Sequence, residues 1–132
     1  MLSTADLTTL ARARLKDAKA LLAKGRYAAA AYLCGYAVEI ALKTRIVKTL
    51  KWSGFPSENN EVAGLKNFWT HDLQLLVHLS GREDKMKAKF PTEWTVVTQW
   101  TPESRYHPPG TMTRAETEYM IECAGKVVGA LL

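Results

Sequence analysis

The sequence has few cysteines and no long apolar run. Cys34 and Cys123 lie inside helical patterns, and neither belongs to a C-x-x-C pair or a His/Cys cluster. This argues against zinc and a disulfide framework and favours buried thiols in a reducing compartment. The longest apolar run, 27–38, is interrupted by Gly35 and stopped by Glu39, and it is too short to span a bilayer. With no signal-peptide core at the start, we expect a soluble, cytoplasmic protein.

Length and charge set the next limits. A chain of 132 residues with 47% hydrophobic residues is expected to form one folded domain over 1–132. The net charge is +5, and the excess lies in the first half. Residues 1–51 hold ten Lys/Arg against three Asp/Glu, and residues 52–132 hold eight against ten. A polyanion, if one binds, is expected on that first half.

Two strong helical patterns open the chain. Ser3 and Asp6 form a capping pair, after which leucines and alanines recur at helical spacing until Gly25. The second helix is expected over about 27–50, and its first half is apolar on every side, as in a helix enclosed by others. Small residues on one stripe of this helix allow close backbone approach: Ala28, Ala31 and Gly35.

The rest of the chain also has helical patterns. Residues 52–69 have no convincing period and are expected to connect elements, tied down by Trp52, Phe55, Phe68 and Trp69. A third helix is expected after a cap at Thr70, and a fourth over about 83–100, broken or restarted at Pro91. Thr113 begins a capping box for the last helix. The sequence predicts an all-α, four- to five-helix antiparallel bundle.

One carboxylate stands out inside the most apolar helix. Glu39 must find a partner there, because an unpaired buried charge costs several kcal/mol. Lys43 lies four residues on, and Tyr32 and Tyr36 share the same stripe. The group is either an ion pair at the edge of the core or a polar seam that faces the loops.

The histidines allow several readings. His71 stands at a helix start, where it can be a first-turn or core-edge residue, and His78 lies two turns further on, too far to share one metal ion. We find no metal-ligand constellation, no catalytic triad and no glycine-rich phosphate loop, so no metal and no cofactor are predicted.

Taken together, the motifs resemble the HEPN family. The segments are YLCGYAVEIALKTRI, then TH followed by DLQLLVHL, then SRYHPP before a capped last helix. The resemblance implies a helical bundle linked to nucleotide binding, a homodimer, and a partnership with a minimal nucleotidyltransferase. By motif, its polar site residues correspond to Glu39, Lys43, His71, Arg105 and Tyr106.

Many HEPN members are metal-independent ribonucleases, with an arginine followed four to six residues later by a histidine on one helix. No arginine here has a histidine at that distance, and Arg105 and His107 are only two apart in a proline-bounded loop. The resemblance is therefore to a branch that lacks the ribonuclease motif. It implies a non-catalytic nucleotide-binding or partner module, working with a nucleotidyltransferase in a toxin–antitoxin or defence-type system.

Two alternatives stay open. One is a ribonuclease with a rearranged site, in which Arg105, His107 and His71 act on RNA. The other is a purely structural dimerisation domain.

The SRYHPP segment makes the most specific structural prediction. Pro108 and Pro109 fix two φ angles and hold His107 out of helical conformation, so the turn is stiff. We expect Arg105 and Tyr106 to point inward, toward Glu39 or a bound anion, and His107 to point outward. All five residues matched by motif are expected to converge.

Overall fold

The protein is a bundle of α-helices. The computed structural model describes residues 1–56, 68 and 70–132, and within these ranges it holds six α-helices and one 3₁₀ helix. They are α1 (Thr4–Ala23), α2 (Tyr27–Leu50), α3 (Leu73–Leu79), α4 (Glu83–Lys89), α5 (Pro91–Val97), η3 (Pro102–Tyr106) and α6 (Arg114–Leu131). The predicted all-α fold is confirmed. Most of the expected 52–69 connection, including Trp69, lies outside the described residues.

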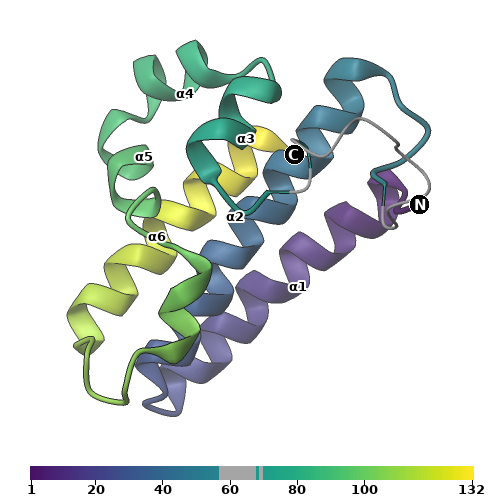
Figure 1. The fold of residues 1–132 in the computed structure, drawn as a ribbon. Helices are drawn as coiled ribbons and strands as arrows, with labels where there is room; N and C mark the ends of the chain where they lie inside the picture. The colour runs from purple at the N-terminus through teal and green to yellow at the C-terminus, as the bar shows by residue number, and fades with distance from the viewer. Residues whose placement is uncertain (57–67, 69) are drawn as a thin grey trace.

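The first two helices form an antiparallel hairpin (Figure 1). Ser3 caps α1, where its hydroxyl accepts a hydrogen bond from the Asp6 amide at 3.1 Å. Gly25 ends the turn with φ of +73°, a left-handed conformation that costs glycine little. The N-cap at Ser3 and the helix stop at Gly25, both predicted from the sequence, are therefore confirmed.

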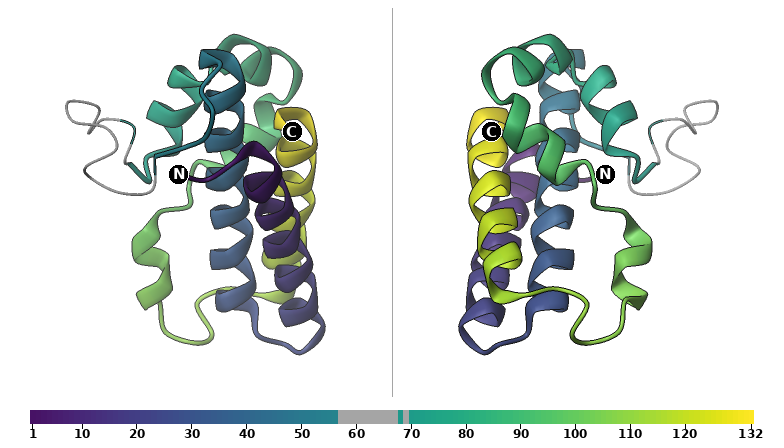
Figure 2. Two further views of the ribbon diagram at one scale, coloured as in Figure 1. Left: turned by 90° about the vertical axis from the view of Figure 1, so that its right-hand side faces the viewer. Right: turned by 90° about the vertical axis from the view of Figure 1, so that its left-hand side faces the viewer.

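Helix α2 forms the centre of the molecule. Thirteen of its residues are buried, and α1, α3 and α6 pack around it. As the two views of Figure 2 show, α1 runs antiparallel to α2 and α6, whereas α2 and α6 run in the same direction. Arg45 and Lys48 of α2 donate hydrogen bonds to the carbonyl groups of Leu131 and Leu132 at the end of α6. No helix among the described residues has the length and apolarity that crossing a membrane requires.

The short helices α3, α4 and α5 cover one end of the bundle (Figure 1). The cap of α3 is Asp72 rather than Thr70, because the Asp72 carboxylate accepts hydrogen bonds from the amides of Gln74 and Leu75. The helix predicted over 83–100 restarts at Pro91, as expected, and gives α4 and α5. It ends at Val97 rather than 100.

The segment around SRYHPP contains more helix than expected. Residues Pro102–Tyr106 form η3, and His107 follows in an extended conformation (φ −66°, ψ 133°) before Pro108, as predicted. Tyr106 is 73% exposed. The prediction that this side chain points inward is therefore wrong.

Trp100 anchors the start of this segment on the central helix. Its indole nitrogen donates a hydrogen bond to the Tyr32 carbonyl at 3.1 Å. Its ring lies so close to Gly35 that a Cβ atom there would be 2.2 Å from the ring. The predicted close approach at Gly35 is thus realised, and the partner is a side chain rather than another helix backbone.

Candidate functional site

A stripe of polar and aromatic residues runs along the outer side of α2. It comprises Tyr32, Tyr36, Glu39 and Lys43, and the rings of the two tyrosines lie 6.2 Å apart. The stripe contacts loop segments in turn: Trp100 near Tyr32, His71 beside Glu39, and Phe55 beneath Lys43. Both readings of Glu39 therefore apply, because it forms an ion pair with Lys43 and belongs to a seam that faces the loops.

Glu39 joins two segments of the chain, α2 and the residues before α3, through its two carboxylate oxygens. It is only 1% exposed, yet Oε1 lies 2.6 Å from Nδ1 of His71 and Oε2 lies 3.3 Å from Nζ of Lys43. The Lys43 ammonium also lies 5.3 Å from the centre of the Phe55 ring, within cation–π range. These contacts replace the hydration that the buried carboxylate has lost.

A hollow of about 330 Å³ opens beside this cluster, and we call it the His71 hollow. Its polar side chains are Tyr36, Glu39, Lys43 and His71, and apolar residues from the start of the chain, α1, α2 and the segment after α2 complete the wall. Burial, and then the nearby Glu39 carboxylate, raise the pKa of Tyr36. Its phenol therefore stays protonated at neutral pH.

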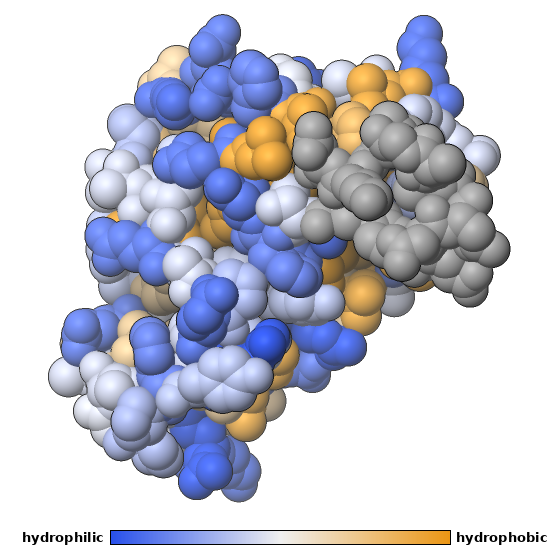
Figure 3. Space-filling model, viewed as in Figure 1, coloured by the Kyte–Doolittle hydropathy of each residue, from blue (hydrophilic) through white to orange (hydrophobic). Residues whose placement is uncertain are grey.

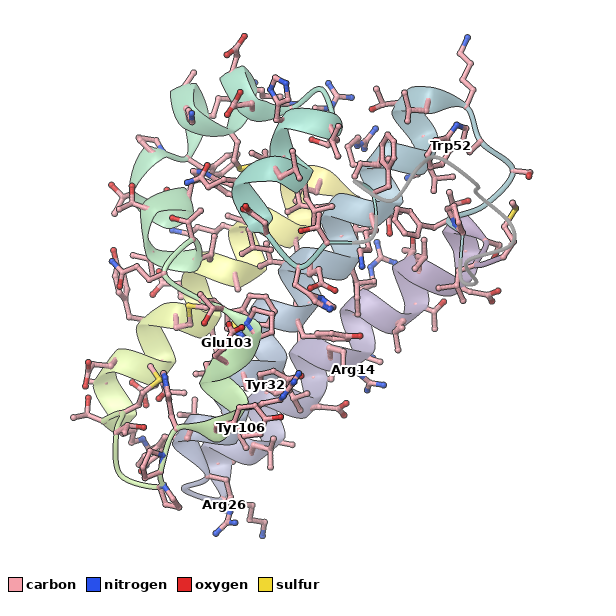
Figure 4. The ribbon with its side chains drawn as sticks, viewed as in Figure 1. Arg14, Arg26, Tyr32, Trp52, Glu103 and Tyr106 are labelled. Carbon is pink, nitrogen blue, oxygen red and sulfur yellow. The ribbon has the colours of Figure 1, made fainter. Side chains whose placement is uncertain are left out.

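Arg105 and Tyr106 lie at a different position along α2. The Arg105 guanidinium stacks over the Tyr106 ring at 4.8 Å, and Figure 4 shows Tyr106 beside Tyr32, between η3 and α1. Hydrogen bonding with Tyr106, and then with Tyr32, raises the pKa of Arg105. Within the described chain, no carboxylate forms an ion pair with this arginine.

The five residues matched by motif therefore divide into two groups. Glu39, Lys43 and His71 converge, whereas Arg105 and Tyr106 meet α2 at Tyr32. Tyr32 and Glu39 are seven residues apart, which is about 10 Å along a helix. The expected contact between Arg105 and Glu39 is not formed.

A second hollow, of about 410 Å³, lies where η3 faces the start of α2, and we call it the cationic hollow. Arg26, Arg105 and His107 contribute to its wall, together with Tyr27 and Tyr32. Arg26 is the N-cap of α2 but makes no side-chain capping bond. The first amides of a helix have no partner within it, so this end of a 24-residue helix offers unpaired N–H groups and a positive dipole end.

The cationic hollow adjoins a third, of about 570 Å³, which we call the apolar hollow. The two share Ala28, Ser104 and His107. Walls of the apolar hollow come from α2, α5, α6 and the segments between α5 and α6: Ala31, Val96, Trp100, Met112, Tyr119 and Met120. The hydroxyl oxygen of Ser104, on the shared wall, is buried without a hydrogen-bond partner. Figure 3 shows mainly hydrophilic groups over η3 and the lower part of the bundle.

Sequence reasoning missed several of these wall residues. Arg26 could have been noticed, since it stands at a helix start where Ser, Thr, Asp or Asn is usual. Trp100 could have been noticed as a large aromatic residue directly before a proline-bounded segment. Ser104 carries no such signal, because its burial depends on how η3 lies against α2.

The same geometry also bears on metal binding. In the described parts of the chain, no three His, Cys, Asp or Glu side chains gather closely enough to hold an ion. The arrangement offers cations, aromatic rings and one oriented imidazole instead.

These features define a small helical-bundle domain with a cationic hollow beside an apolar one. Residues 4–57 match the family model of the HEPN domain, which confirms the resemblance recognised in the sequence. The matched segment holds α1, α2 and therefore Glu39 and Lys43, whereas His71, Arg105 and Tyr106 lie beyond it. No curated protein and no solved structure matches the chain.

Proposed function

We propose that this domain binds a nucleotide, without reacting with it, in the adjoining cationic and apolar hollows under η3. The observation that carries the proposal is their shared wall, because Ser104 and His107 line both hollows. Two arginines and a helix N-terminus stand on one side of it, and aromatic and apolar side chains on the other. A nucleotide has the same division between charged phosphate and flat base.

The phosphate would lie in the cationic hollow. Arg105 is suited to contact it because a guanidinium donates two parallel hydrogen bonds to phosphate oxygens and no described carboxylate competes for it. The open end of α2 adds amide donors and a positive dipole end.

The base would lie in the apolar hollow against Trp100, Tyr119 and Met120. The unpaired Ser104 hydroxyl supports this placement, because a buried hydroxyl without a partner is rare and a ligand would satisfy it. Volumes of 410 and 570 Å³ also fall within the range of small-molecule sites, roughly 300–1,000 Å³.

Binding of ATP, AMP, adenosine and inorganic phosphate to the purified chain tests the proposal by calorimetry. Arg105→Ala should weaken nucleotide binding about tenfold or more, the expected loss for a charge-assisted hydrogen bond, without changing the melting temperature. Arg12→Ala is the control, because Arg12 is exposed on α1 and does not line either hollow. Equal affinity in wild type and Arg105→Ala would contradict the assignment.

The resemblance to HEPN domains extends the proposal to partners. A domain that only binds needs a second protein for chemistry, so we propose association with a minimal nucleotidyltransferase, in a toxin–antitoxin or defence-type system, with the domain itself as a homodimer. Co-purification with the nucleotidyltransferase, in the presence and absence of nucleotide, is the test.

One observation favours ribonuclease activity as a second candidate. Arg105 and His107 line the same cationic hollow, so a phosphodiester there would meet a cation and an imidazole. His71 takes no part, since it lines the His71 hollow and not the cationic hollow. Metal-free cleavage of an RNA oligomer that disappears with His107→Ala, at unchanged stability, would favour this candidate over simple binding.

A further inference from the structure

Glu39 holds His71 in one orientation and selects one tautomer of its neutral ring. The ionised carboxylate can only accept a hydrogen bond, so Nδ1 of His71 must donate at the observed 2.6 Å. The lone pair of the neutral imidazole is then on Nε2, and the side chain is 56% exposed. Among the described residues none hydrogen-bonds Nε2. A buried acid thus orients an imidazole whose Nε2 has no hydrogen-bond partner in the described part of the chain.

Lys43 supplies a positive charge beside that nitrogen. Its ammonium binds the second oxygen of the same carboxylate and its side chain is 16% exposed. One of its three N–H groups is engaged by Glu39, and an oxygen that gains negative charge can accept a hydrogen bond from another.

The remaining wall of the His71 hollow is apolar. Leu7, Leu10, Ile40 and Phe55 surround a volume of about 330 Å³, which is at the small end for ligand sites. Such a wall suits a short hydrocarbon chain, with its polar end toward His71 and Lys43.

We propose that Glu39, His71 and Lys43 form a second site, independent of the nucleotide hollows, that hydrolyses small esters of short-chain carboxylic acids. Nε2 of His71 removes a proton from water while the water oxygen bonds to the acyl carbon. The carbonyl π electrons move to oxygen, opposite the Lys43 ammonium. The intermediate then expels the alcohol oxygen, which takes the proton from Nε2, and the products are one acid and one alcohol.

Another histidine in the same chain provides a matched comparison. His78 lies 3.2 Å from Glu83 through Nδ1, but its side chain is 70% exposed and Glu83 is 31% exposed. Glu83 also has a second cation, since Lys87 lies 3.1 Å from its other oxygen, but the acid is not buried and neither His78 nor Glu83 lines the His71 hollow. This pair should therefore be inert in the same assay.

The test is the initial rate of 4-nitrophenyl butyrate hydrolysis by the full chain, measured from pH 5 to pH 8. His71→Gln should lower the rate by about a hundredfold or more, the usual scale of general-base catalysis, and His78→Gln should leave it unchanged. Lys43→Met keeps the hydrocarbon stem and removes the charge, and it should lower kcat by about tenfold or more with less effect on KM.

Glu39 is a positioning residue, so its test is the split between kcat and KM. Glu39→Gln should lower kcat with less effect on KM, because the amide no longer fixes which ring nitrogen of His71 donates, while the hollow that holds the ester is unchanged.

The outcomes decide the proposal even if Glu39→Gln or Lys43→Met fails to fold, because His71→Gln changes a side chain that is 56% exposed and keeps a hydrogen-bond donor beside Glu39. Hydrolysis that persists in folded His71→Gln, or a wild-type rate no higher than that of free imidazole at equal concentration, would overturn it. Neither result bears on nucleotide binding, because the assay does not involve Arg105.

Discussion

At the scale of single residues, Gly35 decides where the η3 segment lies. The absence of a side chain there lets the Trp100 ring rest on α2, and the same indole donates a hydrogen bond to the Tyr32 carbonyl. Trp100 is also part of the wall of the apolar hollow. One glycine therefore fixes both the route of the chain after α5 and the shape of a candidate binding site.

Gly35→Ala should destabilise the protein by about 1–2 kcal/mol. A new methyl group 2.2 Å from the indole ring forces the ring away, at a cost of about 1–3 kcal/mol, and the better helix propensity of alanine returns up to about 1 kcal/mol. Urea denaturation measures the change. Gly129→Ala in α6 is the control, because a Cβ there meets nothing within 4 Å, and it should be neutral or stabilising. Equal stability of the two variants would show that Trp100 adapts freely.

At the scale of elements, α6 shows how both ends of a helix are satisfied. Thr113 and Glu116 form the reciprocal capping box at its start, with both hydrogen bonds at 3.1 Å. Its last carbonyl groups accept hydrogen bonds from Arg45 and Lys48 of α2. The start of α6 is thus determined by hydrogen bonds within its own first turn, and its end by tertiary contacts with α2.

Thr113→Ala should lower the free energy of unfolding, measured by urea denaturation, by about 1 kcal/mol, the usual contribution of an N-cap, whereas Thr9→Ala within α1 should not.

The hydrogen bond from the Thr113 amide lowers the pKa of Glu116. Its contribution is therefore present above the carboxyl pKa of the unfolded chain and is lost as pH falls through the lower folded value. Thermal melts of wild type and Glu116→Ala should converge on acidification, and a difference that stays constant from pH 7 to pH 3 would contradict this.

Helix boundaries could be predicted where the signal is local. Ser3, Gly25 and the Thr113 capping box are short-range devices, and all three are found as expected. The α3 cap was misplaced by two residues because Thr70 and Asp72 can both cap, and the sequence does not show which carboxylate or hydroxyl reaches the free amides. The extent of η3 was missed because its conformation depends on Trp100 packing against α2.

The candidate site was only partly predictable for the same reason. The pairing of Glu39 with Lys43 follows from helical spacing, and a partner such as His71 is required by the burial of the carboxylate. The point at which the SRYHPP segment meets α2 depends on the route of the chain through α3, α4 and α5. No sequence period encodes that route, so Arg105 was assigned to the wrong turn of the helix.

At the scale of the whole molecule, self-association remains a prediction. A single chain already buries thirteen residues of α2, so the apolar half of that helix is not available as an interface. Exposed aromatic surface lies instead on the side of η3 and α6, where Tyr106 is 73% and Tyr119 is 46% exposed.

We therefore expect a twofold dimer that uses this side. Light scattering at micromolar concentration should give twice the 14.7 kDa of one chain. Tyr119→Glu should shift the mass toward the monomer, and Leu50→Glu, at the far end of α2 and 40% exposed, should not. A monomer mass for the wild type would refute the prediction.

The short turn between α1 and α2 has a consequence for the order of folding. The largest helix–helix contact in the molecule joins elements separated by only three residues, Lys24, Gly25 and Arg26, so closing that loop costs little chain entropy. By contrast, Arg45 must find a carbonyl 86 residues away before the end of α6 is fixed. We expect the α1–α2 hairpin to appear early and to serve as the template on which α6 condenses, with η3 and both of its hollows completed last.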